Sequence, residues 1–211
     1  MSDTLRGYQE YVMTGFTKMQ PIAIERARGA LVWDEGGREY VDCFAGISVV
    51  NAGHGNPDVV AAARDEIAAA FQPGDHLSTF GGNPVSCAAG FANVQYMLRE
   101  NLPEQSRQKG EYAMARLRAA KLPLVGDVRG LGLMIGVELV TDEAKTPAAA
   151  EANAVREACL RRGVLIGVGG VHGNELRIQP PLVILKDELD RALGALSESL
   201  AEVGAGAMVT R

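Results

Sequence analysis

Few side chains in this sequence stand at spacings that specify a reaction by themselves. The three histidines, His54, His76 and His172, occur singly, without a second ligand at helical or loop spacing, so the sequence predicts no metal site. Gly130 and Gly132 lack the preceding strand and following helix that a dinucleotide-binding fingerprint needs, and the chain has no Walker loop and no nucleophile elbow. Spacing alone therefore indicates no more than a soluble α+β domain.

Composition and charge restrict the class of protein. Of the 211 residues 47% are hydrophobic and 22% are charged, which excludes a disordered chain, a coiled coil and a collagen-like fibre. A net charge of −5 argues against a nucleic-acid partner, and no apolar run approaches the roughly 18 residues of a membrane span. The odd number of cysteines favours buried thiols in a reducing compartment: Cys43, Cys87 and Cys159. We therefore expect a soluble cytoplasmic protein with neither a nucleic-acid nor a membrane partner.

The elements nearest the N-terminus are predicted from alternation and capping signals. Two strand-like runs, 30–34 and 39–44, flank a glycine pair and predict a β-hairpin. Asn56 and Pro57 predict the N-cap and the first position of a helix. A second Asn-Pro start predicts a helix over 84–99, whose apolar surface we expect to be buried against another layer.

The rest of the chain alternates between helices and strands. After a charged helix, the stretch 126–140 predicts a turn, in which Arg129 bonds backbone carbonyls, followed by one strand. A helix over 151–162 precedes a strand, turn and strand over 164–180, and the tail 204–211 of a final leucine-striped helix is expected to fray. Antiparallel hairpins packed with helices give the fold class α+β. We expect three parts within one folded unit, namely an N-terminal segment, a glycine-rich turn with its linking helix, and a C-terminal α+β part: 1–70, 71–99 and 100–211.

Four segments of the chain carry a family resemblance. They include the motifs FAGISVV, STFGGNP, GDVRGLGLMIGVEL and LRIQPP, and they lie in residues 21–63, 74–90, 126–139 and 175–184. In this order they resemble segments of the class III, pyridoxal-phosphate-dependent aminotransferases, the group that contains the 4-aminobutyrate, ornithine, acetylornithine and alanine–glyoxylate (type 2) enzymes. One motif alone would be weak evidence, whereas four in family order are specific.

The resemblance implies a fold and an omission. In this family a central domain holds the Schiff-base lysine, and a small domain is assembled from both ends of the chain. Here the predicted helix runs directly into FQPGDHLSTF at residues 70–71, so the central cofactor-lysine domain is missing, and the chain resembles the small domain of a fold-type I aminotransferase. The lysines lie among polar or turn residues or at the end of the amphipathic N-terminal stretch, and we expect each to be a solvated surface lysine and none to be the aldimine lysine: Lys18, Lys109, Lys121, Lys145 and Lys186.

The same resemblance implies a binding site. Ser78 and Thr79 match the hydroxyls that reach the cofactor phosphate across a dimer interface, with a capping turn as the alternative interpretation. Arg177 matches the arginine that binds a substrate carboxylate through two parallel hydrogen bonds, with a surface ion pair as the alternative. Gly46 and Ile47 match the apolar wall beside the substrate, although Ile47 alone would be assigned to the core.

The function implied by the resemblance is transamination. The family moves an amino group from an amino acid, an ω-amino acid among the candidates, to a 2-oxo acid with pyridoxal 5′-phosphate, and it does so as a dimer. Because the lysine segment is absent, we expect the chain to be inactive alone, with no catalytic residue of its own. Two alternatives stay open: a non-catalytic module that pairs with itself or with a full-length aminotransferase, and a deletion product without an evolved role.

Overall fold

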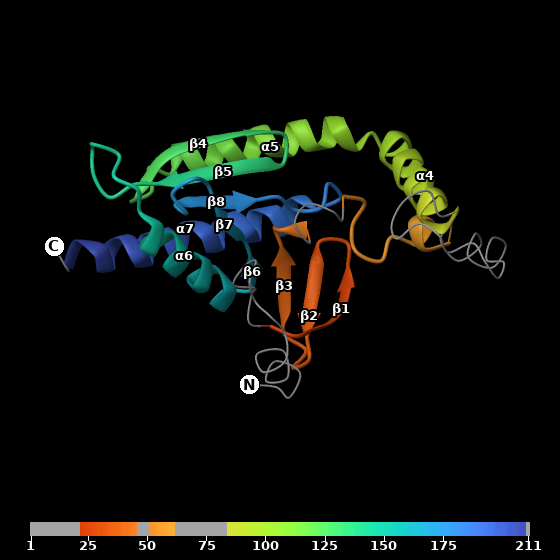
Figure 1. The fold of residues 1–211 in the computed structure, drawn as a ribbon, viewed down its shortest axis with the longest axis horizontal. Helices are drawn as coiled ribbons and strands as arrows, with labels where there is room; N and C mark the ends of the chain where they lie inside the picture. Colours follow the sequence, from red (N-terminus) through yellow and green to blue (C-terminus); the bar gives the residue numbers. More distant parts are fainter. Residues whose placement is uncertain (1–21, 46–50, 62–83, 210–211) are drawn as a thin grey trace.

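Two four-stranded sheets and a set of long helices make up the described part of the computed structural model, residues 22–45, 51–61 and 84–209 (Figure 1). For residues 84–87 and 207–209 the description covers the backbone alone. The α+β fold class predicted from the sequence is confirmed, with hairpins and helices in the expected combination.

The first sheet combines three strands from the N-terminal part of the chain with one strand from its later part. Its strands, in spatial order, are β1 (Ile24–Arg28), β2 (Leu31–Asp34), β3 (Glu39–Asp42) and β6 (Val164–Leu165). The first three are antiparallel, whereas β3 and β6 run parallel, with Val41 opposite Val164. The predicted hairpin is confirmed as β2–β3, and Oδ1 of Asp34 holds its turn by accepting the N–H groups of Gly36 and Arg38 at 2.9 Å each.

The second sheet is antiparallel throughout. Its strands, in spatial order, are β4 (Val125–Leu131), β5 (Met134–Leu139), β8 (Glu175–Ile178) and β7 (Gly167–Gly169). The prediction of a turn at the start of 126–140 is wrong, because the glycines there serve close strand contact. A Cβ on Gly126 would lie 2.8 Å from a methyl carbon of Val140, and one on Gly130 would lie 2.4 Å from the carbonyl oxygen of Met134. The turn itself lies at Gly132, whose φ is +55°.

Three helices form a layer behind the second sheet: α5 (Leu102–Ala119), α6 (Ala149–Arg161) and α7 (Lys186–Val209) (Figure 1). Gly163, with φ +77°, follows the end of α6 as predicted. The sequence predicts fraying of the tail 204–211, but α7 continues to Val209 and Gly204 packs on Pro123, where an added Cβ would lie 2.6 Å from the proline ring. Residues 210–211 lie outside the described residues. None of the described helices combines the length and apolar character that crossing a bilayer requires.

The core lies between this helical layer and the inward face of the second sheet. Ile135, Val137 and Leu139 of β5 and Leu176 and Ile178 of β8 are each at most 2% exposed. The leucine stripe predicted for the last helix is confirmed in the same core: Leu189, Leu193, Leu196 and Leu200. Because successive side chains of a strand point to opposite faces, the residues between these apolar positions point away from the core. We call this outward surface of β4, β5, β8 and β7 the open face.

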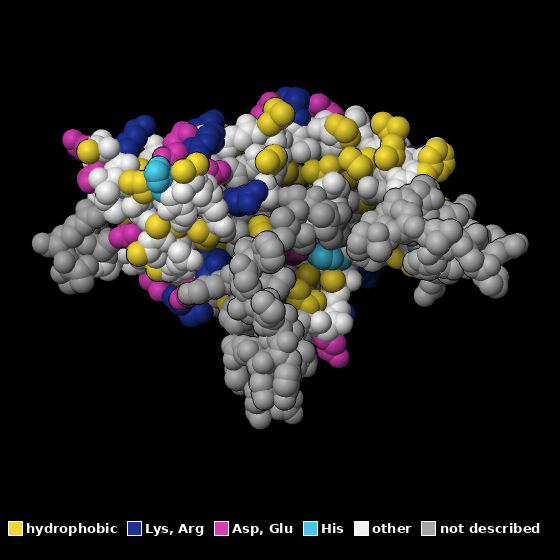
Figure 2. Space-filling view, in the orientation of Figure 1, with side chains coloured by type: hydrophobic (Ala, Val, Ile, Leu, Met, Phe, Trp, Pro, Cys, Tyr) yellow, Lys and Arg dark blue, Asp and Glu magenta, His cyan; other side chains and the backbone are white. Residues whose placement is uncertain are grey.

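α4 (Pro84–Arg99) has the predicted bounds but not the predicted burial. Phe91, Val94 and Leu98 are 67%, 53% and 71% exposed, and their spacing places them along one side of the helix. We call these three residues the α4 stripe. Apolar side chains gather over α4 and the adjoining part of α5 in Figure 2. The stripe is exposed because no described element packs over it.

Gly110 and Gly194 provide a matched test of the helical layer. A Cβ on Gly110 in α5 would lie 1.9 Å from the carbonyl oxygen of Gly132, whereas one on Gly194 in α7 would meet nothing within 4 Å. We expect Gly110→Ala to lower the free energy of unfolding by roughly 1–3 kcal/mol, because two backbone segments must separate. Gly194→Ala should raise it by up to about 1 kcal/mol through helix propensity. Urea unfolding followed by circular dichroism measures both, and equal effects would contradict the close packing of α5 on the β4–β5 turn.

Candidate functional site

The stretch that follows β8 is bonded to the N-terminal part of the chain. The N–H of Gln179 donates to the carbonyl of Cys43 at 2.6 Å, and the N–H of Leu182 donates to the carbonyl of Asn51 at 3.0 Å. Cys43 and Asn51 stand on either side of the predicted wall residues Gly46 and Ile47, which lie outside the described residues. The backbone thereby brings the surroundings of that predicted wall to the end of the strand that carries Arg177.

A buried carboxylate fixes the turn between β3 and residue 45. Asp42 is 4% exposed, and its Oδ1 accepts the N–H groups of Phe44 at 2.9 Å and Ala45 at 2.8 Å. Its Oδ2 lies 2.7 Å from Nε2 of His54, whose backbone pairs with Gly29. Asp42 therefore has hydrogen bonds at both oxygens, as a buried carboxylate requires. No sequence signal indicates this role, because Asp42 stands at an ordinary strand end.

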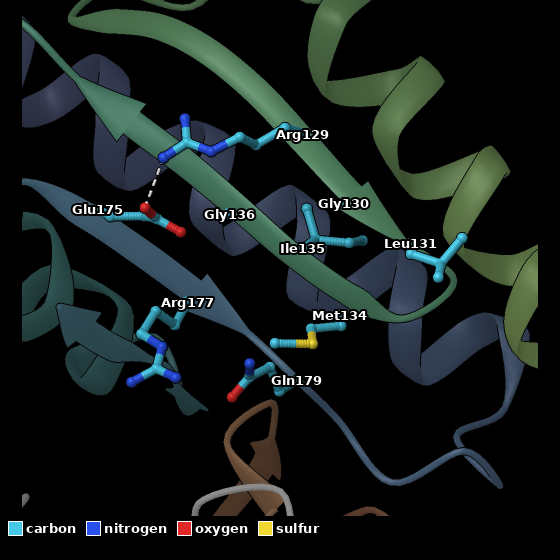
Figure 3. Close-up of a pocket in the computed structure, with 9 residues that line it drawn as sticks. All are labelled: Arg129, Gly130, Leu131, Met134, Ile135, Gly136, Glu175, Arg177 and Gln179. Carbon is cyan, nitrogen blue, oxygen red and sulfur yellow. Dashed lines mark hydrogen bonds and ion pairs between the residues drawn. The ribbon is translucent and has the colours of Figure 1, made fainter. Parts of the chain in front are cut away.

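Arg177 lies on the open face, at a pocket of about 250 Å³ (Figure 3). Its neighbours in register are both glycines, Gly136 on β5 and Gly167 on β7, so no side chain stands directly beside it in either flanking strand. The arginine stem passes over Gly169, where an added Cβ would lie 2.9 Å from Cδ of Arg177. The pocket is lined by Arg129, Gly130, Leu131, Met134, Ile135, Gly136, Glu175, Arg177 and Gln179. Three strands thus place one half-buried guanidinium at a concave, glycine-rich surface.

The guanidinium of Arg177 has no hydrogen bond or ion pair within the described part of the chain. Within this part the surface ion pair considered as an alternative for Arg177 is therefore not formed. Arg129, the other arginine of the pocket, differs, and the prediction that it bonds carbonyls is wrong. Its guanidinium meets three carboxylates, at 2.7 Å from Glu138, 2.6 Å from Glu175 and 3.1 Å from Asp127. Hydrogen bonds, first to Glu138 and then to Asp127, raise the pKa of Arg129.

The described lysines do not line this pocket. Lys121, Lys145 and Lys186 are exposed, as expected, whereas the expectation of a solvated amine is wrong for Lys109. The Lys109 amine is half-buried and donates to Oε1 of Gln105 at 3.1 Å and to the carbonyl of Leu182 at 3.2 Å. Burial lowers the pKa of Lys109. Lys18 lies outside the described residues.

The residues of the pocket fit a carboxylate and do not fit pyridoxal 5′-phosphate. Condensation with the cofactor aldehyde needs an amine, and the pocket offers two guanidinium groups but neither an amine nor a hydroxyl. Ser78 and Thr79, the residues predicted to contact the phosphate, lie outside the described residues. The residues that line the pocket therefore supply no group that condenses with the cofactor.

Neither the thiols nor the potential metal ligands of the described residues form a second functional site. Cys43 and Cys159 are free and buried, and burial raises the pKa of both thiols, that of Cys159 to about 11. Such thiols are protonated near neutral pH and behave as small apolar residues. Within the described ranges no three residues among His, Cys, Asp and Glu are grouped so that they could hold a metal ion.

Several solved structures that share this fold are aminotransferases. The ornithine aminotransferase of Toxoplasma gondii superposes with a TM-score of 0.83 at 16% sequence identity, covering 97% of this chain and 96% of that chain. An aminotransferase of Bacillus anthracis superposes with a TM-score of 0.82 at 16% identity, covering 94% of this chain and 98% of that chain. The chain therefore has the fold of the fold-type I aminotransferases, as the resemblance predicted.

Sequence comparison narrows this class to one family. The model of the aminotransferase class-III family matches residues 12–65 and 61–200, and the chain belongs to that family, whose members depend on pyridoxal 5′-phosphate. The chain is 47% identical to the acetylornithine aminotransferase of Methanopyrus kandleri over 152 residues. These residues make up 72% of this chain and 36% of the relative. The chain is 44% identical to an ornithine aminotransferase of Exiguobacterium over 140 residues, which make up 66% of this chain and 32% of the relative. This chain thus spans about a third of the length of the curated relatives it matches.

Proposed function

We propose that this chain is the small-domain part of a class III aminotransferase and that Arg177 binds the carboxylate of its amino-acid or 2-oxo-acid substrate. The observation that carries the proposal is the Arg177 guanidinium, which has no partner among the described residues and stands at the glycine-rich pocket. A guanidinium donates two parallel, charge-assisted hydrogen bonds to a carboxylate, so its geometry suits this ligand. The contacts of Gly46 and Ile47 with substrate, and of Ser78 and Thr79 with the cofactor phosphate, stay predictions from the family motifs.

The pocket also supports a substrate with an aliphatic stem. Leu131 and Met134, at the tip of the β4–β5 hairpin, are 86% and 64% exposed and line the same pocket as Arg177. A carboxylate held by Arg177 would leave the methylene groups of the ligand beside these two apolar side chains, which reduces their contact with water. An amino acid with its second functional group several carbons from the carboxylate, such as an ω-amino acid, has this shape.

We further propose that the chain does not catalyse transamination alone. In the complete reaction the cofactor supplies the electron sink, and a lysine must hold it. The two family matches meet at residues 61–65, close to the junction predicted at residues 70–71, and this supports the omission of an internal segment that holds the lysine. The division into 1–70, 71–99 and 100–211 within one folded unit belongs to the same proposal. A hydrophobic cluster that contains both Val41 and the α7 leucines supports the joining of the first and third parts.

Replacing Arg177 tests carboxylate binding. We expect the full chain to bind 2-oxoglutarate, and Arg177→Gln to weaken that binding by roughly tenfold or more, since a charge-assisted hydrogen bond contributes about 1.5–3 kcal/mol. Arg177→Lys keeps the charge but not the planar pair of donors and should fall between the two. Titration followed by NMR measures the affinities. Arg107→Gln, which removes an exposed arginine of α5, is the matched control and should bind like the parent chain. Equal affinity of the parent and Arg177→Gln would contradict the proposal.

Reductive trapping tests the absence of an aldimine lysine. After addition of pyridoxal 5′-phosphate and borohydride, we expect no lysine to be labelled above the level of an exposed amine, and Lys145 measures that level. Peptide mass spectrometry locates any adduct. Stoichiometric labelling of one lysine, with Lys109 and Lys18 as the positions to inspect, would overturn the claim that the chain is inactive alone.

The α4 stripe favours a second candidate function, an assembly module that pairs with itself or with a full-length aminotransferase. Three large apolar side chains on one side of a helix, each more than half exposed, favour association. Light scattering over a concentration series should give a dimer for the parent chain and a monomer for Leu98→Ser. A monomer at all concentrations would exclude self-pairing. The free buried thiols Cys43 and Cys159 support a reducing, cytoplasmic location for either candidate.

A further inference from the structure

Glu175 lies near two arginines, Arg177 on its own strand and Arg129 two strands away, and it pairs with Arg129. Glu175 and Arg177 are two residues apart on β8, so their side chains leave the same face of the strand next to each other. Two residues along a strand span roughly 7 Å, so the long side chains of Glu175 and Arg177 are within reach of each other. In this structure Oε2 of Glu175 instead lies 2.6 Å from Nη2 of Arg129 on β4, on the far side of β5. Figure 3 shows this pair, with the Arg177 guanidinium pointing away from it.

Gly136 makes the long contact possible. It lies in register between Arg129 on β4 and Arg177 on β8. A Cβ at this position would lie 2.3 Å from Oε1 of Glu175, which is closer than any real contact. The Glu175 side chain therefore passes over β5 where that strand has no side chain.

Arg129 holds the Glu175 carboxylate on that side, next to a second carboxylate, that of Glu138. Glu138 stands directly opposite Glu175 on β5, and two like charges in that position repel. Arg129 lies 2.7 Å from Oε2 of Glu138 and 2.6 Å from Oε2 of Glu175, so one guanidinium bridges the two carboxylates and reduces their repulsion. Arg129 is half-exposed, and so the pair adds little to stability, but it determines where the Glu175 carboxylate lies.

We propose that Arg129 is a positioning residue for the carboxylate site: it holds Glu175 across Gly136 and thereby keeps this carboxylate off Arg177. The inference rests on the proposed function of Arg177. Without Arg129, the Glu175 carboxylate would be tethered two residues from the guanidinium. A tether this short gives an effective concentration on the order of millimolar, which competes with a small-molecule carboxylate. Glu175 is therefore a competitor of the ligand within the chain itself, and Arg129 keeps it away from Arg177.

The test follows the Arg177 side chain with and without ligand. In spectra of the arginine Nε–H groups of the full chain, with Arg177→Lys used for assignment, we expect Arg129→Gln to shift the Arg177 signal and slow its hydrogen exchange in the absence of ligand. The double variant Arg129→Gln/Glu175→Gln should return the signal to that of the parent. Affinity for 2-oxoglutarate should fall roughly tenfold in Arg129→Gln and recover in the double variant. A purely structural role of Arg129 would predict no such recovery.

Two further variants keep the test decisive. Gly136→Ala keeps both arginines but displaces Glu175, so it should change the Arg177 signal as Arg129→Gln does, even if the latter fails to fold. Arg107→Gln removes the same charge from α5 and should change neither readout. An unchanged Arg177 signal in both Arg129→Gln and Gly136→Ala overturns the inference. Absence of 2-oxoglutarate binding by the parent chain overturns the proposed function instead, and the ligand-free signal still decides the role of Arg129.

Discussion

The alternation of β8 is the constraint on which the site depends. Leu176 and Ile178 must enter the core, because each is almost fully buried between the second sheet and the helical layer. This burial forces Glu175 and Arg177 onto the opposite face together, since a strand cannot turn one without the other. Arg177, the proposed ligand of a carboxylate, therefore shares its face of β8 with the anionic side chain of Glu175. Arg129 on β4 and Gly136 on β5 separate Glu175 from Arg177, because the Glu175 side chain passes over the glycine and pairs with Arg129.

The join between the two ends of the chain places the site in its surroundings. β6 pairs with β3, and the backbone after β8 bonds to Cys43 and Asn51. Residues far apart in the sequence therefore meet next to Gln179, which lines the pocket. The ring of Phe44 packs over Gly167, where an added Cβ would lie 2.5 Å from it. Glycine in this part of the structure serves close approach between segments, at Gly136 and Gly167 alike, more than it serves turns.

Local signals predicted much of the fold, whereas contacts between distant residues escaped them. The β2–β3 hairpin, the bounds of α4 and the leucine stripe of α7 follow from alternation, caps and helical period. β4 did not, because Gly126 and Gly130 look like turn residues until the neighbouring strand is known. The role of Arg177 is predicted from a family motif and not from local signals. The pairing of Arg129 with Glu175 across Gly136 has no local signal, because Glu175 is 46 positions from Arg129 in the chain and meets it only in the folded sheet.

The parallel pairing of β3 with β6 also has a consequence for how the protein is made. A ribosome releases the β1–β2–β3 hairpins long before the residues of β6 exist, so in that interval one side of β3 is an edge without a neighbouring strand. Such an edge invites pairing with other nascent chains. The edge of β3 is covered only after the last third of the polypeptide, which contains β6, has been synthesised. Slow synthesis would therefore lengthen the period in which this edge is exposed.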